Sequence, residues 1–207
     1  MSFVARQHDR LVSATWADLP DPVATLLAVV ILAEAPDGES TTIDAAGMRW
    51  NARSWGNPQD PPLVAAHGIM SDGGVYWRIG PALAAAGRRV IAVDLPAHGG
   101  TGPWNGRYTL ADTAADLASF IRAMDLDSTR LAVLGHSWGG AVAAALPAAG
   151  FRPRSLVLLD PPCLGLDGML AMTRDAVEHS YTSVQEARGN LRAAYPAWSD
   201  GDVEAKA

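Results

Sequence analysis

Short apolar runs alternate with amphipathic stretches from residue 41 to residue 160, which predicts strands that alternate with helices. Runs with few polar breaks are typical of strands that are buried on both faces of a parallel sheet. Such runs lie at residues 63–68, 88–96, 129–135 and 155–160. An antiparallel hairpin is predicted before them, with strands at 41–45 and 48–55 and a turn at Ala46-Gly47.

Three helices are predicted between these strands, at residues 75–87, 109–126 and 138–150. The second begins at Thr109, a residue type that caps helices, and its apolar side chains recur at helical spacing. These apolar positions are Leu110, Leu117, Ile121 and Met124. The predicted fold class is therefore α/β, with a mostly parallel sheet and helices on both of its faces.

The two ends of the chain differ from this alternating region. Residues 1–40 are predicted to be an N-terminal extension, residues 41–163 the core, and residues 164–207 part of a helical lid. Within the lid, apolar positions keep helical spacing over 169–197, which suits either a pocket lining or packing onto the core. An apolar run at 23–33 is too short to span a bilayer.

Composition and charge narrow the function classes. The 207 residues are 49% hydrophobic and 18% charged, with a net charge of −6 and no long run of one sign. That balance argues against nucleic acid or an anionic membrane as a partner. The single cysteine, Cys163, suits a reducing compartment, so we expect a cytoplasmic protein, with export as the alternative because residues 23–35 imitate a signal peptide.

The strongest chemical signal is Gly135-His136-Ser137-Trp138-Gly139, which matches G-x-S-x-G. A serine in a sharp strand-to-helix turn has a strained backbone that lifts its hydroxyl above the sheet. Small residues on either side allow the strand and the helix to approach each other closely. The predicted strand before this motif and the predicted helix after it supply the context in which the serine is a nucleophile.

Four segments in chain order resemble the α/β-hydrolase family over about residues 42 to 200. They are His67-Gly68-Ile69, the loop 94–101 (DLPAHGGT), the turn around Ser137, and 158–162 (LLDPP). This resemblance implies that Ser137 attacks a carbonyl or similar electrophile and that the N–H groups of Ile69 and Trp138 bind the resulting oxyanion. The loop departs from the family pattern at Ala97, where glycine is usual, and at Thr101, where serine is usual, which leaves its turn geometry open.

The resemblance also implies a catalytic histidine, which the family takes from the loop after the last strand of its sheet. His8, His67, His98 and His136 occupy positions that do not suit a base, so His179 is left. It gives the order Ser137, Asp160, His179, but it falls about 200° around its predicted helix from the apolar Val177. We therefore expect His179 to face solvent. Asp160 is a candidate for the acid of the triad, and a purely structural aspartate is an equal alternative.

These observations favour a chain that lacks the C-terminal part of the family fold, including its last two strands. The expected function is that of a serine hydrolase of ester or C–C bonds, weakly active or inactive as it stands. The alternatives are a complete small hydrolase that uses Ser137, Asp160 and His179, and a non-catalytic protein that binds a small ligand. We expect a small apolar carbonyl substrate, no metal or organic cofactor, and self-association through an exposed sheet edge at 155–160.

Overall fold

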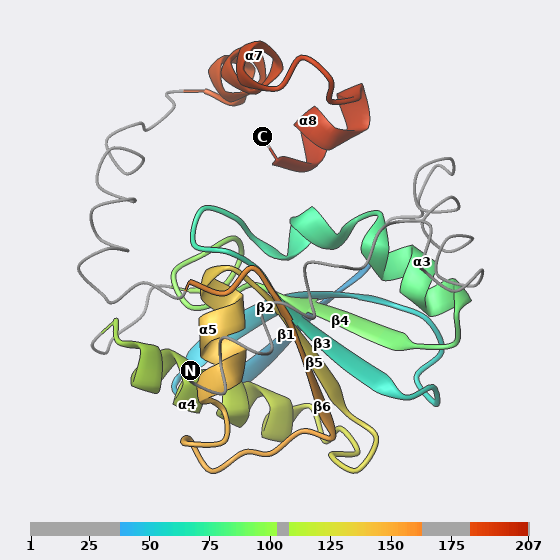
Figure 1. Ribbon diagram of the computed structural model, residues 1–207, viewed down its shortest axis with the longest axis vertical. Coiled ribbons are helices and arrows are strands. Elements are labelled where there is room, and N and C mark those ends of the chain that lie inside the picture. The colour runs from blue at the N-terminus through green and yellow to red at the C-terminus, as the bar shows by residue number, and fades with distance from the viewer. Residues whose placement is uncertain (1–37, 103–107, 163–182, 207) are drawn as a thin grey trace, which may run out of the picture. The chain divides into compact units, whose positions relative to one another are not determined.

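The computed structural model describes residues 38–102, 108–162 and 183–206. Contacts divide the whole chain into Met1–Ala35 and Pro36–Ala207, and the described residues all belong to the second unit. They form a six-stranded sheet with the order β1-β2-β4-β3-β5-β6 (Figure 1). The strands are β1 (Glu39–Ala45), β2 (Met48–Trp55), β3 (Pro62–Ala66), β4 (Arg89–Val93), β5 (Ala132–His136) and β6 (Ser155–Leu159).

The sheet is mostly parallel, as the sequence predicts. Strands β4, β3, β5 and β6 run parallel to one another, whereas β1 and β2 form an antiparallel hairpin and β2 pairs antiparallel with β4. The hairpin turn is at Ala46 and Gly47, which both have positive φ values, 52° and 73°. Two consecutive positive φ values are the mark of the tight turn whose twist matches a hairpin.

Helices cover both faces of the sheet. One face carries α4 (Leu110–Ala123) and α5 (Trp138–Ala145), and the other carries α3 (Ile79–Ala85) together with the 3₁₀ turn η2 (Gly73–Tyr76) (Figure 1). Side chains alternate along each strand between two apolar clusters, so that Val64 and Ala66 lie in one cluster and Leu63 and Ala65 in the other. This explains why the buried strands read as unbroken apolar runs.

Thr109 caps α4 as predicted, since its side chain accepts a hydrogen bond from the N–H of Asp112 at 3.1 Å. The helix predicted over 75–87, however, is wrong in its first part. Asp72 caps a separate 3₁₀ turn at Gly73–Tyr76, and α3 begins only at Ile79. The chain bends there because the Asp94 carboxylate holds the N–H of Gly73 at 2.6 Å and the Tyr76 hydroxyl donates to the carbonyl of Ala66 at 2.8 Å.

Two helices follow in the C-terminal region, α7 (Val184–Ala194) and α8 (Asp200–Lys206). The first lies within the stretch 169–197, where helical spacing is predicted, and the second lies beyond that stretch, where no helix is predicted. Ser199 and Asp202 hold this helix to the core, because an Arg78 Nη lies 2.9 Å from the Ser199 hydroxyl and 3.3 Å from the Asp202 carboxylate. Among the described helices, none is both long and apolar enough to cross a bilayer.

Candidate active site

Ser137 lies in a strained turn between β5 and α5, at the carboxyl end of the parallel strands. Its backbone angles, φ 50° and ψ −118°, fall outside the regions that residues with a side chain normally occupy. Such a conformation costs about 1–3 kcal/mol and persists only where the surrounding structure enforces it. Here the N–H of Ser137 donates to the carbonyl of Leu159 at 2.9 Å, which ties the turn to the end of β6.

The glycines of the motif are required by close backbone contacts around this turn. A Cβ atom on Gly135 would lie 2.2 Å from the carbonyl oxygen of Gly139, and one on Gly139 would lie 2.3 Å from the carbonyl oxygen of Ala66. Both distances are far below van der Waals contact. The G-x-S-x-G pattern therefore reflects the close packing of α5 against β5 and β3.

The segment His67-Gly68-Ile69 lies directly beside the serine. The N–H of Gly139 donates to the carbonyl of His67 at 3.0 Å, and a Cβ atom on Gly68 would lie 3.3 Å from Cβ of Ser137. The two segments predicted to form one site are thus adjacent in the fold. Gly68 keeps the space next to the Ser137 side chain open.

Two backbone N–H groups, those of Trp138 and Ile69, belong to the serine turn and to the adjacent segment after β3. Within the described residues, the N–H groups of Ile69 and Trp138 donate to no protein acceptor. The carbonyls of the same two peptide units are held in place: that of Gly68 by the His67 ring and by the N–H of Ser71, and that of Ser137 by the N–H of Ala141. In a trans peptide the N–H points away from its carbonyl, so these contacts restrict the direction of both donors.

His67 is fully buried and its contacts define its protonation. The N–H of Leu95 donates to Nε2 at 3.0 Å, so Nε2 carries no proton, and Nδ1 donates to the carbonyl of Gly68 at 2.7 Å. Burial lowers the pKa of His67 from 6.5 to about 4. Both ring nitrogens are thus engaged with the backbone, and His67 serves to hold the Gly68–Ile69 peptide.

Asp94 organises the loop that follows β4. Its carboxylate accepts hydrogen bonds from the N–H groups of Gly73 and Gly100 and from the Asn51 amide, at 2.6 to 2.8 Å. The Thr101 hydroxyl donates to the Asp94 carbonyl at 2.8 Å and accepts from the N–H of Asn51 at 3.0 Å. Threonine in place of the usual serine therefore still supplies the hydroxyl that the loop needs. The sequence gives no signal for the part that Asn51 takes in this network.

Ala97, the other departure from the family pattern, sits in a turn that favours glycine. The N–H of His98 donates to the carbonyl of Leu95 at 3.0 Å, with Pro96 and Ala97 as the central residues. The φ angle of Ala97 is 63°, and proline followed by a residue of positive φ is the signature of a type II turn. The turn forms with alanine, but at the cost of a left-handed backbone on a residue with a side chain.

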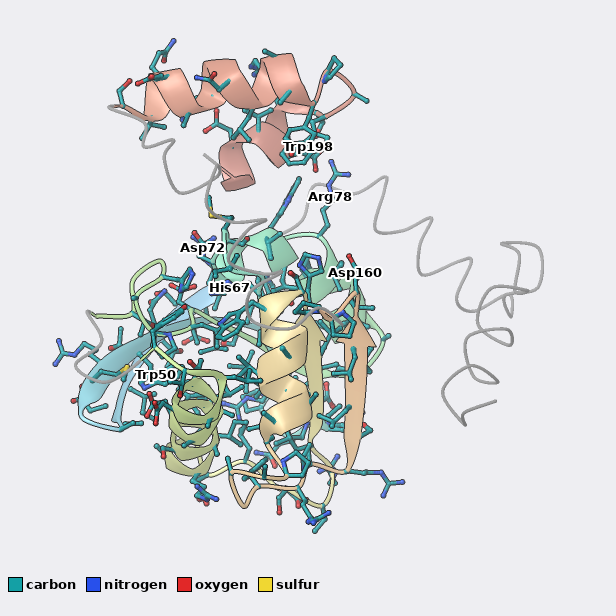
Figure 2. The ribbon with its side chains drawn as sticks, turned by 60° about the vertical axis from the view of Figure 1, so that its left-hand side comes forward. Trp50, His67, Asp72, Arg78, Asp160 and Trp198 are labelled. Atoms are coloured by element: carbon teal, nitrogen blue, oxygen red, sulfur yellow. The ribbon has the colours of Figure 1, made fainter. Side chains whose placement is uncertain are left out.

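Asp160 directly follows β6 (Figure 2). Its φ angle is positive, 45°. Its side chain is exposed and, within the part of the chain that the structure describes, makes no hydrogen bond or ion pair. None of the three described histidines (67, 98 and 136) makes a hydrogen bond to the Ser137 hydroxyl. His179 and Cys163 lie outside the described residues.

An aromatic side chain and an exposed apolar side chain lie next to residues of the candidate site. The Tyr108 ring stacks on Trp138, with centroids 5.9 Å apart and an interplanar angle of 17°. Burial raises the pKa of Tyr108. Met70, directly after Ile69, is 52% exposed.

Among the described residues, no group of three or more His, Cys, Asp or Glu side chains is placed to hold a metal ion.

Two known proteins are similar to this chain in sequence. A lipase, LipV of Mycobacterium tuberculosis, is 33% identical over 152 residues, which cover 70% of this chain and 54% of the lipase. The acetyltransferase component of the acetoin cleaving system of Pseudomonas putida is 33% identical over 166 residues, or 67% of this chain and 43% of that protein. The chain thus spans about half the length of these relatives.

Solved structures agree with this likeness. The thioesterase domain from the curacin biosynthetic pathway is 25% identical, with a TM-score of 0.65 over 82% of this chain and 66% of that domain. An E-2-(acetamidomethylene)succinate hydrolase, 23% identical, shares the fold with a TM-score of 0.69 over 82% of this chain and 63% of its own. The sequence model described as "alpha/beta hydrolase fold" matches residues 61–207, more than two thirds of the chain. The chain belongs to the α/β-hydrolase family.

Proposed function

We propose that this protein is a serine hydrolase with Ser137 as its nucleophile, acting on a small apolar substrate that contains a carbonyl carbon. The observation that carries the proposal is the strained backbone of Ser137, φ 50°, beside two N–H groups that have no acceptor among the described residues. Strain of this kind is retained at sites where it serves function. The family membership of the chain supports the same reading.

In the proposed reaction the Ser137 Oγ forms a bond to the substrate carbonyl carbon, the carbonyl oxygen becomes an oxyanion, and the hydroxyl proton passes to a base. The N–H groups of Ile69 and Trp138 donate to that oxyanion. Each such donor is typically worth about 3 kcal/mol of barrier. The first turn of α5 adds the positive end of a helix dipole beside the same atom.

We expect a low rate of hydrolysis, because no described residue is a suitable base for the Ser137 proton. His67 and His98 hold backbone groups with both ring nitrogens, and His136 is next to the serine in a turn where neighbouring side chains diverge. A serine without a base is a weak nucleophile, although an oxyanion hole alone leaves about 10³-fold catalysis over water. We therefore propose weak activity, with Asp160 as the acid of any triad and His179 as a base that contributes little.

The surroundings of Ser137 favour an apolar substrate. The Tyr108 ring, 40% exposed, stacks on Trp138, and Met70, 52% exposed, directly follows Ile69. A lipase and a thioesterase domain among the similar proteins favour an ester or thioester bond, and a C–C bond next to a carbonyl is the alternative. No metal or organic cofactor enters the proposed reaction.

Hydrolysis of p-nitrophenyl butyrate by the purified full chain tests this proposal. We expect slow turnover that Ser137→Ala removes and that His179→Ala leaves within about twofold. Robust turnover that His179→Ala abolishes would show a complete triad and refute the weak-activity proposal. Equal rates in wild type and Ser137→Ala would remove the enzymatic function and leave a ligand-binding protein.

We also propose that the protein self-associates through β6. This strand is the last in the order of the described sheet, and Leu156, Val157, Leu158 and Leu159 each expose 37–41% of their surface. An apolar strand edge invites pairing with another chain, and lysine on such an edge discourages it. Light scattering at increasing concentration should give a rising mass that Leu158→Lys suppresses and Ala115→Lys, on the exposed side of α4, does not. A constant monomer mass in the wild type would refute it.

For location and other partners, we propose a cytoplasmic protein that binds neither nucleic acid nor membrane. The single cysteine and the net charge of −6 support this. Export remains the alternative for the apolar run at 23–33. Fractionation of expressing cells, followed by N-terminal sequencing, decides between the two.

A further inference from the structure

The His98 ring bridges two backbone carbonyls from different loops. Its Nε2 lies 2.6 Å from the carbonyl oxygen of Ile69, and its Nδ1 lies 2.9 Å from that of Pro96. Pro96 belongs to the same turn as His98, whereas Ile69 is 29 residues away in the segment beside Ser137. The Ile69 contact is thus the one that joins the loop after β4 to the loop after β3.

The direction of the Ile69 contact follows from its chemistry. A carbonyl oxygen only accepts hydrogen bonds, so the ring nitrogen that faces it must carry a proton. The imidazolium ion donates to both carbonyls. A neutral ring with its proton on Nε2 still donates to Ile69, but its unprotonated Nδ1 then faces the Pro96 carbonyl as a second acceptor, so the contact with Pro96 is no hydrogen bond in that form. Both of these forms place a donor on the carbonyl of Ile69.

Ile69 is consequently held on both sides of its Cα atom. The peptide before it is fixed through the Gly68 carbonyl, which accepts from His67 at 2.7 Å and from the N–H of Ser71 at 3.1 Å. The peptide after it is fixed by His98. The N–H of Ile69 belongs to the first of these peptides. Its direction therefore depends on the φ angle of Ile69, whose two flanking peptide planes are both held by hydrogen bonds.

We propose that His98 is a positioning residue that keeps the N–H of Ile69 directed at the oxyanion through the Nε2 contact. This inference rests on the proposed function, since it assigns to His98 the support of the donor that Ile69 supplies there. His98 itself touches no reacting atom. Its contact with Pro96 stabilises the loop after β4 and has no part in this positioning.

Two conservative substitutions separate these two contacts. A glutamine amide nitrogen takes the place of Nε2, and an asparagine amide nitrogen takes the place of Nδ1. His98→Gln therefore keeps the donor to Ile69, while His98→Asn keeps only the donor to Pro96. Phenylboronic acid is a suitable probe, because its boron binds a serine hydroxyl and forms a tetrahedral anion without turnover. Titration calorimetry measures its affinity, with Ser137→Ala as the blank.

We expect His98→Gln to bind phenylboronic acid within about twofold of wild type and His98→Asn to bind about tenfold more weakly, since small displacements of a positioned group have large effects. A second readout needs no ligand. The ¹⁵N resonance of Met70, whose amide shares a peptide with the Ile69 carbonyl, should shift in His98→Asn and stay near its wild-type position in His98→Gln.

Equal effects of the two substitutions in both measurements, or a larger effect of glutamine, would overturn the proposal. Unfolding of both variants would also overturn it, because His98 would then be a structural residue of its loop. If wild type binds the probe no better than Ser137→Ala, the proposed function fails. The Met70 resonance then decides alone whether His98 positions Ile69.

Discussion

The buried ring of His67 predicts a specific loss of stability in mild acid. Burial lowers the pKa of His67 from 6.5 to about 4 in the folded chain, whereas in the unfolded chain the ring has its ordinary value. Between these values the unfolded state binds a proton that the folded state does not. The contribution of His67 to stability is therefore complete above about pH 6.5 and is lost progressively as the pH falls toward 4.

The size of this effect follows from the two pKa values. If His67 is fully protonated in the unfolded state and neutral in the folded state, the free energy of unfolding falls by about 3 kcal/mol. Between pH 7 and pH 5 the His67 ring should account for about 2 kcal/mol of lost unfolding free energy. The contact that opposes protonation is visible in the structure, because the N–H of Leu95 requires an unprotonated Nε2.

Urea unfolding at pH 7 and pH 5, followed by tryptophan fluorescence, measures this loss. His67→Asn is the control, since its amide can still donate to the Gly68 carbonyl but does not titrate. We expect the pH-dependent loss to be about 2 kcal/mol smaller in His67→Asn than in wild type. The same pH dependence in both proteins would refute the assignment of a neutral, buried His67.

Other substitutions test the backbone geometry of the site. Ala97→Gly should raise the free energy of unfolding by about 1 kcal/mol, because glycine adopts a φ angle of 63° without strain. Ala115→Gly, on the exposed face of α4, is the control and should lower it by a similar amount. Melting temperatures that change in the same direction in both variants would contradict this. Gly139→Ala should prevent the close approach of α5 to Ala66 and lower the melting temperature sharply. Gly189→Ala, where α7 has open space, should leave the melting temperature unchanged or raise it. Equal melting temperatures of the two variants would contradict the tight packing of the turn around Ser137.

Local patterns were enough to predict most of the fold. The apolar runs predicted β3, β4 and β5, whose side chains are mostly buried on both faces, and also β6, whose side chains are exposed. Thr109 marked the start of α4 because its side chain caps that helix. The bend after Asp72 was missed because it depends on Asp94, 21 residues further on, which holds the N–H of Gly73. Helix α8 was missed because its sequence is polar, although its Val203 is buried.

The candidate site also has parts that the sequence predicts and parts that it does not. Ser137, Ile69 and Trp138 could be singled out because their proposed roles depend on short motifs, and the structure places Gly68 beside Ser137. The supports of the site could not be predicted, since His67 binds Leu95 and His98 binds Ile69 across nearly 30 residues of chain. These contacts form only where the loops after β3 and β4 lie against each other, and no periodicity in the sequence predicts that arrangement.

The chemistry assigned to Ser137 is tested most directly by its reaction with a fluorophosphonate probe, followed by peptide mass spectrometry. We expect one adduct, on Ser137, that forms slowly in the folded protein and does not form after denaturation in urea. Ser137→Ala should give no adduct. Labelling of a different residue, or the same rate of labelling in folded and denatured protein, would contradict the claim that the strained turn prepares this serine as a nucleophile.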